Sequence, residues 1–176
     1  AEGRVRKERP DCDGSPDEEF TRGLVKATEL PTAVANASDH YVVLAPGKAP
    51  RFMSVQEVAR GFMLPAGSTL TRVLMTEKIN GGPLTAIQAV SCLGRSVHVG
   101  VAHQIVRLLK ARGLAYGGMR YASAFSGIDT FAAALELEFG DNFSYVFASE
   151  KDDTVREALL DAWGHHGLTS ALCGSD

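Results

Sequence analysis

The residues of this sequence with the clearest chemical potential are Gly127 and Glu150. Glycine has no Cβ, so the backbone at Gly127 can approach a ligand closely and can adopt a positive φ. A carboxylate at Glu150 can accept two hydrogen bonds from ribose hydroxyl groups. Roughly 20 residues separate turn and acid in dinucleotide-binding folds, and the separation in this sequence is similar. The pair predicts a nucleotide-type ligand, although an ordinary turn glycine and an exposed glutamate would give the same spacing.

The residues around this pair predict a strand, a turn, a helix and a second strand in succession. Residues 119–125 have the composition of a strand, a helix is expected over 130–139, and the second strand, 143–149, ends at Glu150. The turn consists of Phe125, Ser126, Gly127, Ile128 and Asp129. This order predicts an α/β fold, in the form of the opening of a doubly wound, Rossmann-like sheet.

The same residues resemble a known family. Residues 121–131, YASAFSGIDTF, resemble the first motif of the cytosine-C5 DNA methyltransferases, in which a strand ends in F-x-G-x-G. Residues 146–152 resemble their second motif, an acid after a hydrophobic strand. Asp129 stands where the family has its second glycine, and its carboxylate is expected to cap the helix that follows. Lys151 stands where a large apolar or aromatic residue is frequent.

Two earlier segments resemble the ninth and tenth motifs of that family. Residues 51–65 look like the ninth, including a capping-box pattern over 54–57, with Gln56 in place of an arginine. Residues 93–102 resemble the tenth, G-N-S-V before a helix, with Arg95 in place of the asparagine. These motifs usually come last in the chain. The resemblance is therefore to a circularly permuted member, a rearrangement that domains with neighbouring termini tolerate.

The resemblance implies a methyltransferase-type sheet that binds S-adenosylmethionine. The turn over 125–129 would hold the methionine end of the donor, and Glu150 would take the ribose. Lys151 would lie over the adenine, and Asp176 would meet the adenine amino group. The cofactor-binding residues implied in this way are Phe125, Ser126, Gly127, Ile128, Asp129, Glu150, Lys151, Asp176, Ser96 and Val97.

We assign no catalytic residue, because the cytosine-C5 reaction needs a reactive cysteine thiolate in a Pro-Cys pair. Cys12, Cys92 and Cys173 follow aspartate, serine and leucine. The nucleophile and the parts that flip the target base out of the duplex are expected outside this chain, so DNA would be contacted through those other parts of a parent protein. The chain is then a fragment that carries donor-binding parts.

Two other hypotheses remain open. One is a catalytically inactive fragment, derived from a methyltransferase, that acts as a binding or scaffold domain. The other is an unrelated nucleotide-binding enzyme, which would need a phosphate-cradling G-x-G-x-x-G where Gly127 stands alone.

The composition of the chain limits the classes of partner and of location that can be expected. The 176 residues are 45% hydrophobic and 22% charged, with a net charge of −3, so the whole chain does not attract nucleic acid strongly. No apolar run approaches the roughly 20 residues of a membrane span, and the first residues do not resemble a secretory leader. We expect an intracellular chain, nuclear in a eukaryote, with no metal. Surface or capping roles are expected for His98, His103, His165 and His166.

The chain divides into three predicted segments. Residues 1–39 are expected to be a mobile, charged, disordered tail. Residues 40–113 hold a short strand at 40–44 and helices beginning near residues 54, 68, 84 and 97. Residues 114–176 hold the incomplete donor-binding domain, with a helix after Asp152 or Asp153 that runs to Trp163 and then a third strand. The apolar face of the helix near residue 97 consists of Val97, Val101, Ile105, Leu108 and Leu109.

Overall fold

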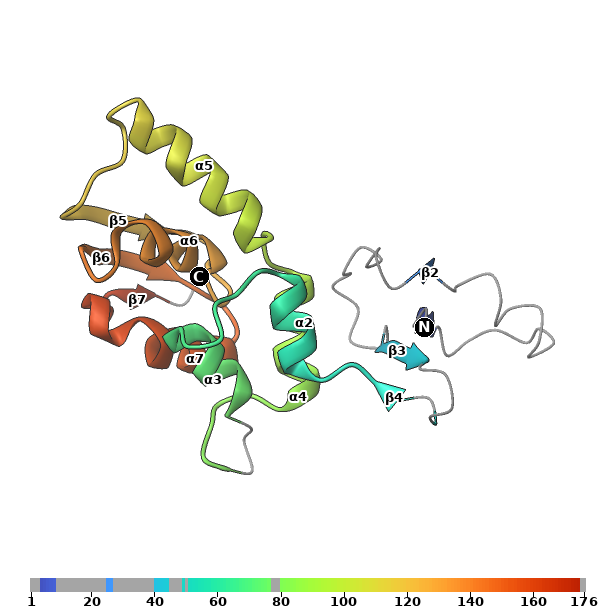
Figure 1. Ribbon diagram of the computed structural model, residues 1–176. Coiled ribbons are helices and arrows are strands. Elements are labelled where there is room, and N and C mark those ends of the chain that lie inside the picture. Colours follow the sequence, from blue (N-terminus) through green and yellow to red (C-terminus); the bar gives the residue numbers. More distant parts are fainter. Residues whose placement is uncertain are drawn as a thin grey trace.

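The computed structural model describes the backbone of residues 4–8, 25–26, 40–44, 49, 51–76 and 80–174, and the side chains of residue 49 and of the last two ranges. A three-stranded sheet lies at the centre of the C-terminal part (Figure 1). Its strands are β5 (Met119–Ser123), β6 (Phe143–Ser149) and β7 (Cys173–Gly174), in the order β5-β6-β7 and all parallel. The α/β prediction is confirmed at this level.

Helices connect these strands. Helix α6 (Thr130–Phe139) joins β5 to β6, and α7 (Asp153–Trp163) with the short helix η2 (Gly164–His166) joins β6 to β7. The bounds of α6 and β6 agree with the prediction, and Asp152 is the residue that caps α7, with its side chain accepting from two backbone N–H groups. Parallel strands need such crossovers, so their helices must lie against the sheet.

The sheet is buried on one face. Phe143 and Tyr145 of β6 are buried, whereas Ser144 between them is exposed, and Arg120 and Ala122 of β5 are exposed in the same alternating way. Successive side chains of a strand point to opposite faces, so the buried set faces the helices. Parallel sheets usually have both faces covered. In the described part of this chain, the face with Ser144, Arg120 and Ala122 remains exposed.

Four of the described helices precede the parallel sheet: α2 (Val55–Gly61), α3 (Thr69–Met75), α4 (Ala86–Gly94) and α5 (Val99–Ala111). Helix α5 packs along α6, α3 packs against α7, and α2 packs against α4 (Figure 1). The centre of α6 is buried all round, at Ala132, Ala133, Ala134 and Leu135. Small alanine side chains allow α5 and the sheet to approach this helix closely on different sides.

The prediction of which face of α5 is buried is wrong. Val101, Ile105 and Leu108 are exposed, whereas the buried residues of this helix are Val99, Ala102 and Val106. The buried side chains are shorter, and they suit the alanine-rich surface of α6 better than the longer side chains would.

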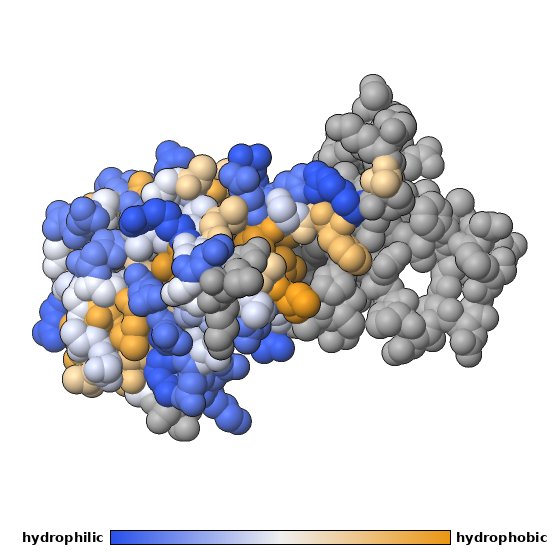
Figure 2. All heavy atoms as spheres, turned by 90° about the horizontal axis from the view of Figure 1, so that it is seen from below, coloured by the Kyte–Doolittle hydropathy of each residue, from blue (hydrophilic) through white to orange (hydrophobic). Residues whose placement is uncertain are grey.

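Apolar residues interrupt the polar surface on the face of the molecule that Figure 2 shows.

A second, antiparallel sheet is formed by the N-terminal strands. Its order is β2 (Val25–Lys26), β1 (Arg4–Glu8), β3 (His40–Leu44) and β4 (Arg51–Phe52). The strand predicted at 40–44 is confirmed. The strands β1 and β2 fall in the segment expected to be a tail, so that expectation is wrong for their residues. The other residues of that segment, and the predicted helical residues 77–79, lie outside the described part.

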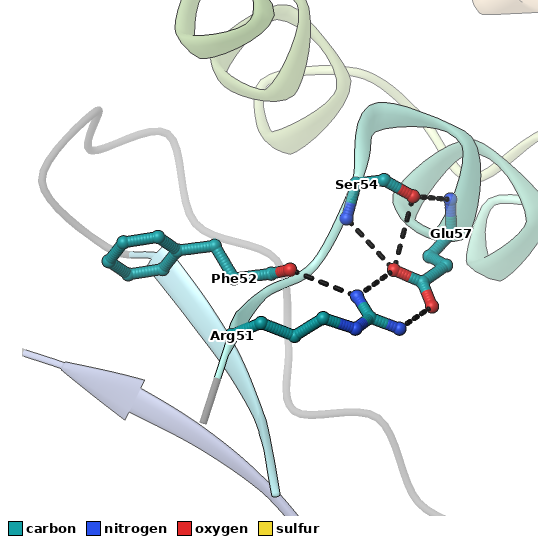
Figure 3. Close-up of polar contacts among 4 residues, drawn as sticks. All are labelled: Arg51, Phe52, Ser54 and Glu57. Atoms are coloured by element: carbon teal, nitrogen blue, oxygen red, sulfur yellow. Dashed lines mark hydrogen bonds and ion pairs between the residues drawn. The ribbon is translucent and has the colours of Figure 1, made fainter. Parts of the chain in front are cut away.

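A polar cluster fixes the start of α2 (Figure 3). Ser54 Oγ accepts from the Glu57 N–H at 3.3 Å, and a Glu57 carboxylate oxygen accepts from the Ser54 N–H at 2.9 Å. The predicted capping box is therefore confirmed. Arg51 adds two hydrogen bonds to the same carboxylate, at 2.7 and 2.6 Å. These contacts, the Arg51 hydrogen bond first, lower the pKa of Glu57 to about 2.

The cap gives a testable prediction. Replacing Ser54 by alanine removes an acceptor from the first turn of α2 and is expected to lower the free energy of unfolding by about 1 kcal/mol. The measurement is urea unfolding followed by circular dichroism. Gln56→Ala, at an exposed position of the same helix, is the matched control and should change little. Equal midpoints for the two variants would contradict the assignment of Ser54 as the cap.

The contribution of Glu57 to stability has a defined pH dependence. Because its pKa is lower in the folded state than the ordinary value of 4.5, the contribution is fully present above pH 4.5. It is lost as the pH falls through about 2.

Candidate functional site

The turn after β5 and the acid after β6 are in direct contact. The Gly127 N–H donates to Glu150 Oε2 at 2.8 Å, and the Asp152 N–H donates to Glu150 Oε1 at 2.9 Å. The Glu150 carboxylate thus joins the turn to the start of α7. A carboxylate offers about four lone-pair positions, so two remain for a ligand. Sequence separation alone does not guarantee this contact; it arises because β5 and β6 are adjacent and parallel.

Two serines hold the turn against the end of β6. The Ser126 N–H donates to the Ser149 carbonyl oxygen at 2.7 Å, and the Ser149 N–H donates to Ser126 Oγ at 3.3 Å. The Phe125 N–H donates to Ser149 Oγ at 3.2 Å. The backbone of the turn is therefore fixed on both sides of Ser126, which leaves the N–H of Gly127 directed at Glu150.

The backbone of this turn is strained. Phe125, Gly127 and Asp129 have φ values of 54°, 56° and 51°. A left-handed backbone conformation is energetically unfavourable for any residue that has a Cβ atom. Such strain is concentrated at functional sites. The Phe125 side chain is also 83% exposed. A Cβ added to Gly127 would meet no atom within 4 Å, so this glycine faces open space. Its positive φ, rather than a lack of room for a side chain, favours glycine at this position.

Hydrogen bonds to the buried side chain of Asp129 hold the turn in place. Its Oδ1 accepts from the Ala132 N–H at 3.1 Å and from the Tyr121 hydroxyl at 3.0 Å, and its Oδ2 accepts from the Tyr145 hydroxyl at 2.9 Å. The expected role as helix cap is confirmed. The residue is 4% exposed, and burial raises the pKa of its carboxyl group. The side chain of Asp129 therefore supports the turn.

The segment that resembles a tenth motif meets this turn. The Thr130 hydroxyl, at the start of α6, donates to the Val97 carbonyl oxygen at 2.8 Å. The Ser96 hydroxyl donates to the Cys92 carbonyl oxygen at 2.6 Å. The first bond connects the loop after α4 to the start of α6, and the second holds that loop against the end of α4. Residues 95–97 therefore border the same space as the turn.

A cavity of about 360 Å³ lies between these elements, within the size range of small-molecule sites. It lies beyond the carboxyl ends of β5 and β6, where open α/β sheets bind their ligands. The lining residues are Cys92, Arg95, Ser96, Val97, Tyr121, Ser123, Phe125, Ser126, Gly127, Ile128, Asp129, Thr130, Phe131, Glu150, Asp152 and Val155.

This lining includes every implied cofactor-binding residue except Lys151 and Asp176. Lys151 is exposed and does not line the cavity, and Asp176 lies outside the described residues. Sequence reasoning missed the other lining residues, among them Cys92 and Asp152. The sequence indicates Asp152 only as a possible cap, and Cys92 lies one helical turn before Ser96, which is the signal that could have indicated it.

The charge of the cavity favours a cationic ligand. Among the described residues, its lining contains one cation, Arg95, and the carboxylates of Glu150 and Asp152, while the carboxyl group of Asp129 is buried beneath the turn. Cys92 also borders the cavity, and burial, the largest effect on this thiol, raises its pKa to about 11. The thiolate is the nucleophilic form of cysteine, so at neutral pH Cys92 is a protonated, weakly reactive group.

The histidines divide into two kinds. His98 caps α5, with Nδ1 accepting from the Gly100 N–H at 3.1 Å, and His103 pairs with Glu138 at 3.0 Å. These agree with the expected capping and surface roles. His166 does not, because it is only 3% exposed. The fold also brings two carboxylates from earlier in the chain, those of Glu136 and Asp141, close to His165 and His166.

The fold and the cavity define an α/β protein with a small-molecule-sized site at the carboxyl ends of parallel strands. No family model, no curated protein and no solved structure matches the chain. In the part of the chain that the structure describes, no helix is both long enough and apolar enough to cross a bilayer.

Proposed function

We propose that this chain is the S-adenosylmethionine-binding portion of a DNA (cytosine-5-)-methyltransferase-like protein, with the three parallel strands as the opening of a Rossmann-like sheet. Methyl transfer to C5 of cytosine would take place in a parent protein whose other parts supply the nucleophile and contact DNA. Both the resemblance of the motifs and the geometry of the cavity support this function.

The contact between Gly127 and Glu150 carries the proposal. It places a glycine backbone and a carboxylate 2.8 Å apart at the ends of adjacent parallel strands. The two lone-pair positions left on Glu150 match the two hydroxyl groups of an adenosyl ribose. The open space beside Gly127 would admit the part of the donor that carries the methyl group.

The remaining contacts would follow from this placement. The backbone of 125–129 would meet the methionine end, and Ser96 and Val97 would border the donor from the side of α4. The positive sulfonium group would be favoured by the excess of carboxylates in the lining. Lys151 would have to turn inward to reach the adenine, because its side chain is exposed in the free protein.

One observation favours the second candidate, an inactive fragment that acts as a binding or scaffold domain. Asp129, which replaces a family glycine, has its carboxylate occupied by Tyr121, Tyr145 and the Ala132 N–H. A turn stabilised in this way without a ligand can persist after donor binding has been lost. A chain that folds and does not bind the donor would support this candidate.

Calorimetry with S-adenosylmethionine tests the proposal. The wild-type chain is expected to bind one equivalent, and Glu150→Gln is expected to bind roughly ten- to hundredfold more weakly, because hydrogen bonds to a charged group contribute about 1.5–3 kcal/mol. Glu157→Gln is the matched control, since Glu157 is exposed on α7 and does not line the cavity. It should bind like the wild type.

Circular dichroism shows whether each variant has folded. The absence of heat from a folded wild-type chain would reject the proposal, as would equal affinities for Glu150→Gln and Glu157→Gln.

A further inference from the structure

Four potential metal ligands meet at the edge of the sheet opposite the cavity. They are Glu136 near the end of α6, Asp141 in the turn before β6, and His165 and His166 in η2. One ligand atom from each lies within 4.8 Å of the others. None of the four lines the cavity, which lies at the carboxyl ends of the strands, so this is a separate site at their amino ends.

His166 is the residue that indicates a metal site in this cluster. Its Nδ1 lies 3.2 Å from the carbonyl oxygen of Phe143, an acceptor, so Nδ1 carries the proton and Nε2 has the lone pair. Among the described residues, Nε2 has no hydrogen-bond partner, although the side chain is only 3% exposed. A buried polar atom without a partner is costly. A ring N–H fixed by a backbone carbonyl is also the usual arrangement of a metal-binding histidine.

The ring of His166 is held in place by its neighbours. Its centroid lies 3.9 Å from that of Phe143 and 4.1 Å from that of His165. The imidazole is therefore oriented before any ion arrives.

The other three ligands need only small movements to complete a site. His165 Nε2 lies 3.5 Å from Glu136 Oε1, close to the separation of about 3.4 Å between two ligands of a tetrahedral zinc ion with bonds of about 2.0–2.2 Å. Asp141 is exposed and His165 is partly exposed, so both side chains can rotate. Two carboxylates and two neutral imidazoles would balance the charge of a divalent cation.

We propose that Glu136, Asp141, His165 and His166 bind one divalent transition-metal ion, with Zn²⁺ as the best fit. Imidazole ligands favour zinc and its neighbours, whereas Mg²⁺ and Ca²⁺ favour oxygen ligands throughout. The ion would connect the end of α6 to η2 and, through the hydrogen bond of His166 to Phe143, to the first residue of β6. It would have a structural role and does not depend on methyl-donor binding.

The test is calorimetry on the chain freed of metal with a chelator. Titration with ZnCl₂ is expected to give one equivalent bound, and MgCl₂ to give no heat. His165→Ala and Asp141→Asn remove ligands at positions exposed enough for the fold to persist, and each is expected to weaken Zn²⁺ binding at least roughly tenfold. His103→Ala is the matched control, because His103 pairs with Glu138 outside the cluster, and it should bind as the wild type does.

Thermal unfolding gives a second readout. Zn²⁺ is expected to raise the Tm of the wild type and of His103→Ala, because a ligand that binds the folded state stabilises it, and to leave the Tm of His165→Ala nearly unchanged. The proposal is overturned if the wild type shows no Zn²⁺ binding. It is also overturned if His165→Ala and Asp141→Asn bind Zn²⁺ as tightly as the wild type, because the ion would then occupy other residues.

Discussion

Replacing Asp129 by alanine is expected to lower the free energy of unfolding by about 3–7 kcal/mol. The variant loses the cap of α6, which contributes about 1 kcal/mol. It also leaves the hydroxyl groups of Tyr121 and Tyr145, which donate to this carboxylate, without their partner, at about 1–3 kcal/mol for each buried group. Urea unfolding followed by circular dichroism measures the loss.

Asp129→Asn is the matched variant. Asparagine tolerates the left-handed backbone, its oxygen can accept from the Ala132 N–H, and its amide can donate to a tyrosine oxygen. We expect it to cost about 1 kcal/mol. An alanine variant as stable as the asparagine variant would show that the hydrogen bonds of this carboxylate do not support the turn.

The wild type and Asp129→Asn together test the raised pKa of Asp129. A carboxyl group whose pKa is higher in the folded than in the unfolded state stabilises the fold fully below the unfolded pKa, whose ordinary value is 3.8, and loses that contribution as the pH rises toward the folded pKa. The stability of the wild type relative to Asp129→Asn should therefore decrease as the pH rises above 3.8. A relative stability that increases over this interval would contradict the assignment.

Trp163→Ala is expected to cost about 3–5 kcal/mol, the range for removing a large buried aromatic side chain. Trp163 is fully buried, and its Nε1–H donates to the Ile128 carbonyl oxygen at 3.1 Å. It is the one tryptophan of the sequence, so unfolding of the alanine variant is followed by circular dichroism rather than fluorescence. The alanine variant loses the packing of the indole ring around α7. It also loses the hydrogen bond to Ile128, which helps to hold the turn over residues 125–129.

Trp163→Phe separates these two contributions. Phenylalanine keeps an aromatic ring against Tyr145 but cannot donate to Ile128, so we expect it to be intermediate in stability. Because Ile128 lines the cavity, the affinity of this variant for the methyl donor should also fall. If Trp163→Ala cost less than about 1 kcal/mol, α7 would not support the turn in the way described.

Much of the C-terminal fold follows from local patterns. The strand 143–149, the helix 130–139 and the strand 40–44 are bounded by turn-forming residues and have clear periodicity, so their limits could be predicted. The cap at Ser54 follows from a four-residue pattern. The contact between Gly127 and Glu150 follows once β5 and β6 are taken to be parallel neighbours, because their carboxyl ends then lie together.

Other features depend on tertiary packing. The most apolar face of α5 is exposed because the alanine-rich surface of α6 accommodates Val99, Ala102 and Val106 instead. The pairing of β1 with β2 and with β3 involves partners distant in the sequence. No metal-ligand spacing in the sequence indicates the cluster around His166, because its carboxylates come from a different helix and turn.

The most direct test of the binding site is a two-dimensional ¹H–¹⁵N NMR titration of the chain with S-adenosylmethionine. We predict chemical-shift changes for the amides of Gly127, Glu150 and Val97, which border the cavity, and none for Gly113 in the turn after α5. Saturating donor that leaves the amides of Gly127 and Glu150 unshifted would contradict the account.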